Sequence, residues 1–171
     1  RILGPNVFAV DDESIEGVVG KLLRKRDATI AVYEDITGGL LAERVQQAGP
    51  EHFIGAIIGG SVASMRRLLA HSRRTDDWDG LSSEPGALAD ELAWAVRSYA
   101  EADFGLALHG EPDPSDTAEN LGRGQTYISI TDGERVDRRS YGYSGRGRPD
   151  RTRLSLNALD LVRIVLMEGH D

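Results

Sequence analysis

The sequence predicts a three-layer α/β/α domain built around a mixed sheet of about five strands. Short apolar runs that suit buried strands alternate along the chain with segments whose apolar residues recur at helical spacing. Strands separated by helices in this way pack into a mainly parallel sheet that is covered on both faces. A later pair of strand segments, joined by a two-residue turn, predicts a hairpin that gives this sheet one antiparallel edge.

The composition allows a single domain and narrows the classes of partner. The 171 residues are 40% hydrophobic and 28% charged, which suffices for one domain with a hydrophobic core. The formal net charge of −8 at pH 7 disfavours binding to nucleic acid or to an anionic membrane. The absence of cysteine excludes disulfides, thiolate catalysis and cysteine-based zinc sites. No apolar run approaches the roughly 20 residues that span a bilayer, so we expect a cytoplasmic domain with no membrane or nucleic-acid partner.

The first half of the chain is predicted to alternate between helices and strands after an extended lead-in. Asp11 and Asp12 offer an N-cap, and apolar residues then recur at i, i+3, i+4 and i+7, which marks one face of an amphipathic helix. Two apolar runs predict buried strands, and a glycine pair follows each of them. In order, we expect a helix at 15–26, a strand at 28–33, a helix at 40–47, a strand at 53–58 and a helix through Met65, Leu68 and Leu69.

The second half of the chain is predicted to add a long helix, a strand, a hairpin and a final helix. Pro85 suits the first turn of a helix, where its missing N–H has no intrahelical partner to lose. Asp132-Gly133 is a typical two-residue hairpin turn. In order, we expect a surface loop at 71–83, a helix from Pro85 through Tyr99, a strand at 103–109, a loop at 110–124, a hairpin at 126–143, a basic loop at 144–149 and a buried helix at 151–167.

The bend at residues 31–40, AVYEDITGGL, is the first candidate site. The change from strand to helix would point the amides of Thr37, Gly38 and Gly39 at a ligand, and the helix dipole would add positive potential there. The glycines would also let a ligand approach the backbone closely. The simpler alternative is a tight turn in which Asp35 or Thr37 caps the following helix. The residues alone leave both readings open.

His109 ends a predicted strand, the place where open α/β sheets bind ligands. Glu111, Asp113 and Asp116 follow it, but acids placed around two prolines are more typical of a solvated loop than of a metal site. We therefore expect no metal and no cofactor. The Gly-x-Ser-x-Gly pattern of serine hydrolases is also absent. A cluster of arginines ahead of the last helix could bind a phosphate or carboxylate, or could pair with surface acids: Arg146, Arg148, Arg151 and Arg153.

Six stretches of the chain carry a resemblance to a known family. They are LGPNVFAVDDESIEGVVGKLLRKR, DITGGLLAERV, FIGAIIGGS, GLALHG, GQTYISI and RTRLSLNALDLVR. In order and spacing they resemble the C-terminal domain of the competence/damage-inducible protein A (CinA) family, from about Gly4 to Glu168. Active members of that family are nicotinamide mononucleotide deamidases, which are amidohydrolases. The resemblance therefore implies a role in pyridine nucleotide metabolism, with a pyridine nucleotide as the ligand, and we also expect a homo-oligomer.

The same resemblance sets the domain boundaries. In the family, the stretch before the first helix follows a separate N-terminal domain, and a sequence that opens on Arg1 agrees with this arrangement. We expect residues 1–11 to be an extended lead-in from an upstream CinA-type domain. Residues 12–171 are then expected to form the CinA C-terminal-type α/β domain.

The chain departs from the family pattern at the residues that carry the chemistry. The family turn reads Glu-Ser-Cys-Thr-Gly-Gly, and its serine and cysteine fall on Asp35 and Ile36. That serine is thought to attack the amide, with a lysine as its base. The lysine falls on Met65, which cannot accept a proton, and a neighbouring tyrosine falls on Gly60. The family loop Thr-Gly-Ile-Ala-Gly-Pro falls on residues 109–114.

These departures favour a catalytically degenerate homologue that serves as a binding, oligomerisation or regulatory module. Asp35 is then expected to cap the helix that starts near Thr37. The alternative is an active amidohydrolase that uses Asp35 and His109 as its catalytic residues. In either case the resemblance implies that the ligand is bound by the retained residues, which are Glu34, Thr37, Gly38, Gly39, Ser61, Gly110, Tyr127, Arg151 and Arg153.

Overall fold

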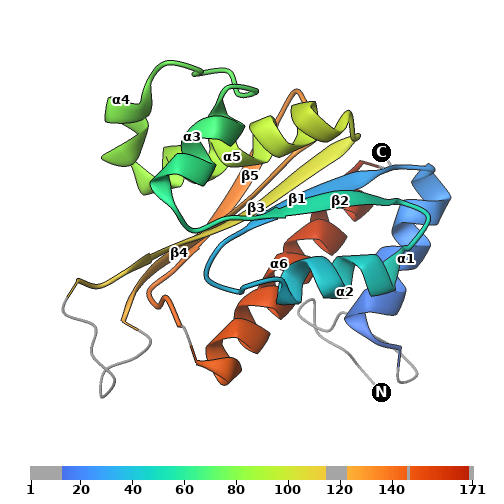
Figure 1. Cartoon of the computed structure of the whole chain (residues 1–171). Coiled ribbons are helices and arrows are strands. Elements are labelled where there is room, and N and C mark those ends of the chain that lie inside the picture. Colours follow the sequence, from blue (N-terminus) through green and yellow to red (C-terminus); the bar gives the residue numbers. More distant parts are fainter. Residues whose placement is uncertain (1–12, 115–122, 146, 170–171) are drawn as a thin grey trace.

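The computed structural model describes residues 13–114, 123–145 and 147–169. In these ranges six helices enclose a five-stranded mixed sheet, and the predicted three-layer α/β/α fold is confirmed. Figure 1 shows α3, α4 and α5 on one face of the sheet and α1, α2 and α6 on the other. The elements are α1 (Ile15–Arg26), β1 (Ile30–Glu34), α2 (Leu40–Ala48), β2 (Phe53–Ile58), α3 (Val62–Leu69), α4 (Trp78–Ser82), α5 (Pro85–Ala100), β3 (Phe104–Pro112), β4 (Gly124–Thr131), β5 (Val136–Tyr141) and α6 (Arg148–Glu168).

The strand order in the sheet is β2-β1-β3-β4-β5. Strand β1 runs parallel to both β2 and β3, which places it in the interior of the sheet as expected. Strand β4 pairs antiparallel with β3 and with β5, so the predicted hairpin forms the antiparallel edge. The expected two-residue turn at Asp132-Gly133 is wrong, because Thr131 pairs with Val136 and the connection therefore spans residues 132–135. The carboxyl ends of β1, β2 and β3 therefore meet at one end of the sheet.

Three elements differ most from the sequence-based expectation. A short helix, α4, interrupts the expected loop at 71–83, because Asp77 caps it by accepting from the amide of Gly80 and Leu81 is fully buried. Strand β3 continues to Pro112, since it keeps pairing with β4 as far as Gly124. Helix α6 begins three residues early, at Arg148, with a proline in its first turn.

Helix α1 begins at Ile15, as expected. Ser14 caps this helix, and its side chain accepts a hydrogen bond of 3.1 Å from the amide of Gly17. The expected cap at Asp11 and Asp12, like the expected lead-in over residues 1–11, lies outside the described residues.

Two hydrophobic clusters fill the layers on either side of the sheet. One lies beneath α1, α2 and α6 and includes Val32 and Leu108, and the other lies beneath α3, α4 and α5 and includes Tyr33 and Ala107. Successive side chains of a strand point to opposite faces. At the end of β1 this alternation directs Glu34 toward α2 and places Tyr33 on the side of α5. The two consecutive acids, Glu34 and Asp35, therefore make different hydrogen bonds.

Candidate functional site

A cleft of about 380 Å³ opens where the parallel strands end. We call it the strand-end cleft, and its lining residues are Asp35, Ile36, Gly38, Gly60, Met65, His109, Gly110, Glu111, Pro112 and Arg151. An open recess of about 690 Å³ is lined by Thr37, Gly38, Gly39, Leu40, Glu43, Arg148 and Arg151. The two hollows share Gly38 and Arg151, so they adjoin and can hold an elongated ligand. Open α/β sheets bind ligands at this end of their strands.

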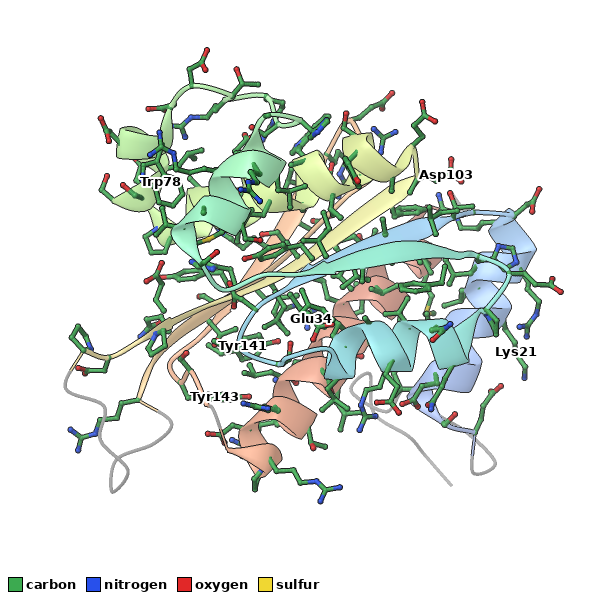
Figure 2. The ribbon with its side chains drawn as sticks, viewed as in Figure 1. Lys21, Glu34, Trp78, Asp103, Tyr141 and Tyr143 are labelled. Atoms are coloured by element: carbon green, nitrogen blue, oxygen red, sulfur yellow. The ribbon has the colours of Figure 1, made fainter. Side chains whose placement is uncertain are left out.

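Glu34 caps α2 from inside the protein. One carboxylate oxygen accepts from the hydroxyl of Thr37 at 2.7 Å and from the amides of Gly39 and Leu41 at 2.8 and 3.2 Å, and the other accepts from the amide of Ala42 at 2.6 Å. Figure 2 shows this fully buried side chain in the interior of the domain, near the start of α2. Its negative charge lies at the positive end of the helix dipole.

This cap corrects two expectations. The expectation that Asp35 caps the helix is wrong, because the alternation of side chains along β1 gives that position to Glu34. The amides expected to face a ligand are also partly used within the protein, since Gly38 donates to the carbonyl of Asp35 and Gly39 donates to Glu34. The carboxylate of Glu34 therefore already occupies the N-terminus of α2. The groups of this region that can attract an anionic ligand are its cationic side chains.

Asp35 ties the ends of β1 and β3 together. Its Oδ1 accepts from the amides of Ile36 and Gly110 at 2.7 and 2.9 Å, and its Oδ2 accepts from the hydroxyl of Tyr33 at 3.1 Å and lies 2.6 Å from Nδ1 of His109. The side chain is 6% exposed. A carboxylate has about four acceptor positions, and here each has a donor. Burial, together with the charge of Asp35, strongly raises the pKa of the Tyr33 hydroxyl, which therefore stays protonated.

His109 lies between two carboxylates. Its Nδ1 faces Asp35, and its Nε2 lies 2.7 Å from Oε1 of Glu111. Burial by itself lowers the pKa of the ring, but the hydrogen bonds to Asp35 and Glu111 outweigh it and raise the pKa to about 9. Both ring nitrogens therefore donate, and His109 is an imidazolium at neutral pH.

The floor of the strand-end cleft is apolar. Met65 is 8% exposed and lies there beside Ile36 and Pro112. A Cβ on Gly110 would lie 2.4 Å from Cδ1 of Ile36, so the isoleucine occupies the space that a side chain at 110 would need. Gly60 has φ of +140°, a conformation that favours glycine. The face of a flat ring can pack against these apolar side chains.

Arg151 lines both the cleft and the recess. Among the described residues no carboxylate lies within ion-pair distance of it, and its Nε is buried without a hydrogen-bond partner. A Cβ on Gly38 would lie 3.6 Å from Nη1 of Arg151, so the guanidinium stands close to the glycine turn. Arg148 lines the same recess. Such an arginine is suited to bind a phosphate or a carboxylate, whereas Arg146 lies outside the described residues.

Four of the expected binding residues do not line the cleft or the recess, and the first of them is Glu34, which is fully buried as the cap of α2. Ser61 caps α3 by accepting from a backbone amide, and it lines a different groove. Tyr127 lies opposite His109 in the pairing of β3 with β4 but is not part of the lining. Arg153 is exposed, and its guanidinium lies 5.2 Å from the ring centre of Tyr143. The structure brings together Asp35, His109, Thr37, Gly38, Gly39, Gly110 and Arg151.

Glu111 is the lining residue that the sequence reading missed. It was assigned to a solvated loop, but in the structure it belongs to β3 and pairs with Gln125. The signal was the i, i+2 spacing of His109 and Glu111, which puts both side chains on the same face of a strand. That spacing matters only if the strand continues past His109. Among the described residues no group of three or more His, Asp or Glu is arranged to hold a metal ion.

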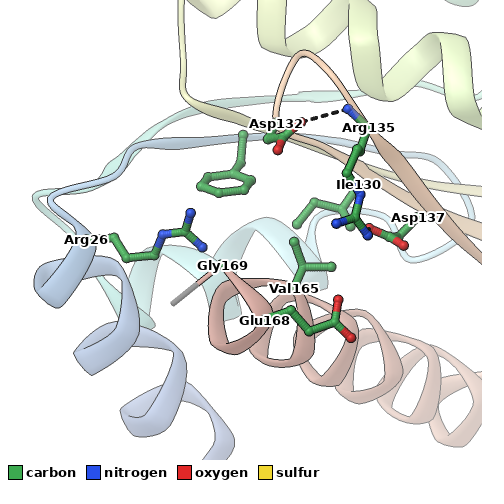
Figure 3. A pocket seen from close by; sticks show the side chains of 9 residues that line it. Arg26, Ile130, Asp132, Arg135, Asp137, Val165, Glu168 and Gly169 are labelled. Atoms are coloured by element: carbon green, nitrogen blue, oxygen red, sulfur yellow. Dashed lines mark hydrogen bonds and ion pairs between the residues drawn. The ribbon is translucent and has the colours of Figure 1, made fainter. Parts of the chain in front are cut away.

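Another hollow lies at the opposite end of the sheet from the cleft and the recess. Figure 3 shows it beneath the β4–β5 turn, with Arg26, Asp132 and Glu168 among its lining side chains. The guanidinium of Arg26 lies 5.3 Å from the ring centre of Phe104 and donates to the carbonyl of Leu166. The volume of this hollow is about 50 Å³, which suits water better than an organic ligand.

Comparison with known proteins connects this chain to one family. The family model of the CinA C-terminal domain matches residues 12–166. A putative competence-damage inducible protein of Thermoanaerobacter pseudethanolicus is 34% identical over 169 residues, covering 97% of this chain and 40% of the relative. A CinA-like protein of Frankia casuarinae is 36% identical over 168 residues, covering 96% of this chain and 38% of the relative. The chain thus spans about 40% of the length of these relatives.

Solved structures share the fold. A CinA superfamily protein of Klebsiella pneumoniae superposes with a TM-score of 0.71 at 18% identity, covering 90% of this chain and 96% of that one. A competence/damage inducible protein of Agrobacterium tumefaciens gives 0.63 at 15% identity, covering 95% and 99%. At these identities the likeness concerns the fold alone. In the described ranges of this chain, no helix is both long and apolar enough to cross a membrane.

Proposed function

This chain belongs to the CinA C-terminal domain family, and on that premise we propose that it binds a pyridine nucleotide without hydrolysing its amide. The domain would then serve as a binding or regulatory module within a longer protein. A homo-oligomer and an upstream CinA-type domain are parts of the same proposal. The relatives, of which it spans about 40%, are long enough to contain such a domain.

The observation that supports the loss of catalysis is the saturation of Asp35 and His109. The carboxylate of Asp35 accepts from three donors besides His109, and both ring nitrogens of His109 face carboxylates. Attack on an amide needs a nucleophile with a neighbouring base. Met65, which occupies the position of the family's lysine, offers no basic atom.

The observation that supports retained binding is that Met65, Ile36 and Pro112 line the same cleft as Arg151, which has no ion-pair partner among the described residues. A nucleotide consists of a flat ring joined through a ribose to a phosphate, and the cleft and recess together have this order of environments. The phosphate would lie against Arg151 and Arg148 near Gly38, and the ring would lie on the apolar floor. Glu34 already occupies the terminus of α2, so the arginines must supply the attraction for the phosphate.

The alternative, an amidohydrolase that uses Asp35 and His109, has one observation in its favour. These two residues lie 2.6 Å apart at the cleft, as a base and its orienting partner would. However, an imidazolium cannot accept a proton, and the raised pKa of His109 keeps the ring in that form at neutral pH. Asp35 would also have to leave several donors before it could act on water or on an amide.

Calorimetric titration with nicotinamide mononucleotide, run beside an assay of ammonia release, tests the proposal. We expect binding without ammonia release by the unmodified chain. Arg151→Ala should weaken binding about tenfold or more, as expected when a charged hydrogen bond to phosphate is lost. Arg153→Ala removes the same charge outside the cleft and serves as the matched control, with binding unchanged. Absence of binding at millimolar ligand would refute the proposal.

A further inference from the structure

Glu111 is the acidic side chain of the strand-end cleft that solvent reaches. Its side chain is 45% exposed, whereas that of Asp35, the other acid in the lining, is 6% exposed. Among the described residues Glu111 makes one hydrogen bond through its side chain, and that bond uses Oε1. Within the described ranges the second oxygen, Oε2, has no hydrogen-bond partner and can accept one from a ligand.

The carboxylate of Glu111 is held in place. Nε2 of His109 lies 2.7 Å from it, and Asp35 fixes the other side of the same ring. The backbone at Glu111 belongs to β3 and pairs with Gln125, so the main chain is also fixed. A carboxylate held in this way loses little conformational entropy when a ligand binds.

The charges divide the binding site into two ends. Asp35 and Glu111 are negative and His109 is positive, so this end carries a net charge of −1. Arg151 lines both the cleft and the recess, and its positive charge has no ion-pair partner within the described ranges. A ligand with an anionic tail and a cationic head therefore matches both ends at once, whereas a ligand with an uncharged head matches only one.

We infer that Glu111 selects ligands whose ring carries a positive charge. In a nucleotide of nicotinamide this ring is a pyridinium. The inference rests on the proposed function, because it requires the nucleotide to occupy the strand-end cleft with its phosphate toward Arg151. Glu111 acts on the ring through its charge, and the carboxamide of the ligand is not required for this selection.

A comparison of two ligands isolates that charge. Oxidised and reduced nicotinamide mononucleotide share the carboxamide, the ribose and the phosphate, but the dihydropyridine ring of the reduced form is neutral. By calorimetric titration at pH 7, we expect the unmodified chain to bind the oxidised form about tenfold more tightly. Glu111→Gln keeps an acceptor for His109 and removes the charge. It should bring the ratio of the two affinities close to one, with the reduced form bound within about twofold of its original affinity.

Glu43→Gln is the matched control. Glu43 is exposed and lines the recess, so its substitution removes one negative charge from the other side of the same site. The tenfold preference should survive this change, because both ligands carry the same phosphate. If Glu43→Gln removed the preference as completely as Glu111→Gln, general electrostatics would explain it and the inference would be wrong.

The remaining outcomes separate the inference from the proposed function. Equal affinity of the unmodified chain for both forms, with binding still dependent on Arg151, would overturn the role of Glu111 and leave the proposed function intact. Failure of both forms to bind would overturn both. A preference that persists in Glu111→Gln would show that another group recognises the ring charge.

Discussion

Nδ1 of His109 lies 2.6 Å from Oδ2 of Asp35, which joins the ends of the two neighbouring strands β3 and β1. This contact is shielded from water, since the two side chains are 4% and 6% exposed. This contact therefore links the ends of β1 and β3 at the strand-end cleft. It also fixes the protonation state of the ring whose Nε2 faces Glu111.

Glu34→Gln should destabilise the domain by about 3 kcal/mol. The carboxylate receives one hydroxyl and three backbone amides, and an amide side chain offers one oxygen in place of two. At least one buried donor would then lose its acceptor, and the favourable charge at the helix terminus would be lost as well. Urea unfolding measures the difference. Glu43→Gln, on the exposed face of α2, is the control and should cost at most about 0.5 kcal/mol. An effect of Glu34→Gln as small as this would contradict the role of Glu34 as a cap.

The stability of the domain should fall as the pH rises through 9. The pKa of His109 is raised from 6.5 to about 9 in the folded state, so folding favours the protonated ring. This contribution is fully present below about pH 6.5 and is lost as the pH passes through about 9, and its full size is about 3 kcal/mol. Unfolding free energies measured from pH 6 to 10 check the trend.

A variant and a spectrum make the test of His109 specific. His109→Gln should show a flatter pH profile than the unmodified chain over the same range. Nuclear magnetic resonance of the ring nitrogens should show both protonated at pH 7. A ring that titrates near pH 6.5 would contradict the two-carboxylate arrangement.

Gly110→Ala should cost about 1–3 kcal/mol, because its Cβ would lie 2.4 Å from Cδ1 of Ile36. The neighbouring residue offers a rescue, since Ile36→Ala vacates the same space. The double variant should therefore be more stable than the sum of the two single effects predicts, by about 1 kcal/mol or more. Thermal unfolding of the four chains gives this coupling directly. Simple additivity would mean that the two residues do not compete for space.

The sequence allowed the fold to be predicted better than the site, and particular residues explain why. Strands and helices follow from local periodicity, which is visible along the chain for β1, α2 and β2. The cap of α2 was assigned to Asp35 instead of Glu34 because the direction of a side chain depends on where the strand ends. Glu111 was missed because β3 is extended by its pairing with β4, which is a tertiary contact. The separation of Arg153 from Arg151 also depends on how α6 packs, which their spacing alone does not reveal.

The last prediction concerns the amide hydrolysis that the proposed function takes to be lost, and it treats two positions as one unit. The sequence resemblance predicts that the family's attacking serine and its lysine base correspond to Asp35 and Met65, and both of these residues line the strand-end cleft. Asp35→Ser alone should release no ammonia from nicotinamide mononucleotide, since no base would stand beside the new hydroxyl. Met65→Lys alone should be equally inactive, since the introduced lysine would lie near the carboxylate of Asp35 without a hydroxyl to activate.

The double variant is the informative one. Position 65 is nearly buried, and burial would lower the pKa of an introduced lysine and let it act as a base. We expect Asp35→Ser with Met65→Lys to release ammonia at least tenfold faster than either single variant, because residues of a catalytic pair are strongly non-additive. Folding of each variant must first be verified by circular dichroism, since Asp35 also joins β1 to β3. The opposite result is equally clear: if the unmodified chain released ammonia within tenfold of an active family member, the degenerate assignment would be wrong. Asp35 and His109 would then have to leave their mutual contact during the reaction, and substitution of either should abolish turnover.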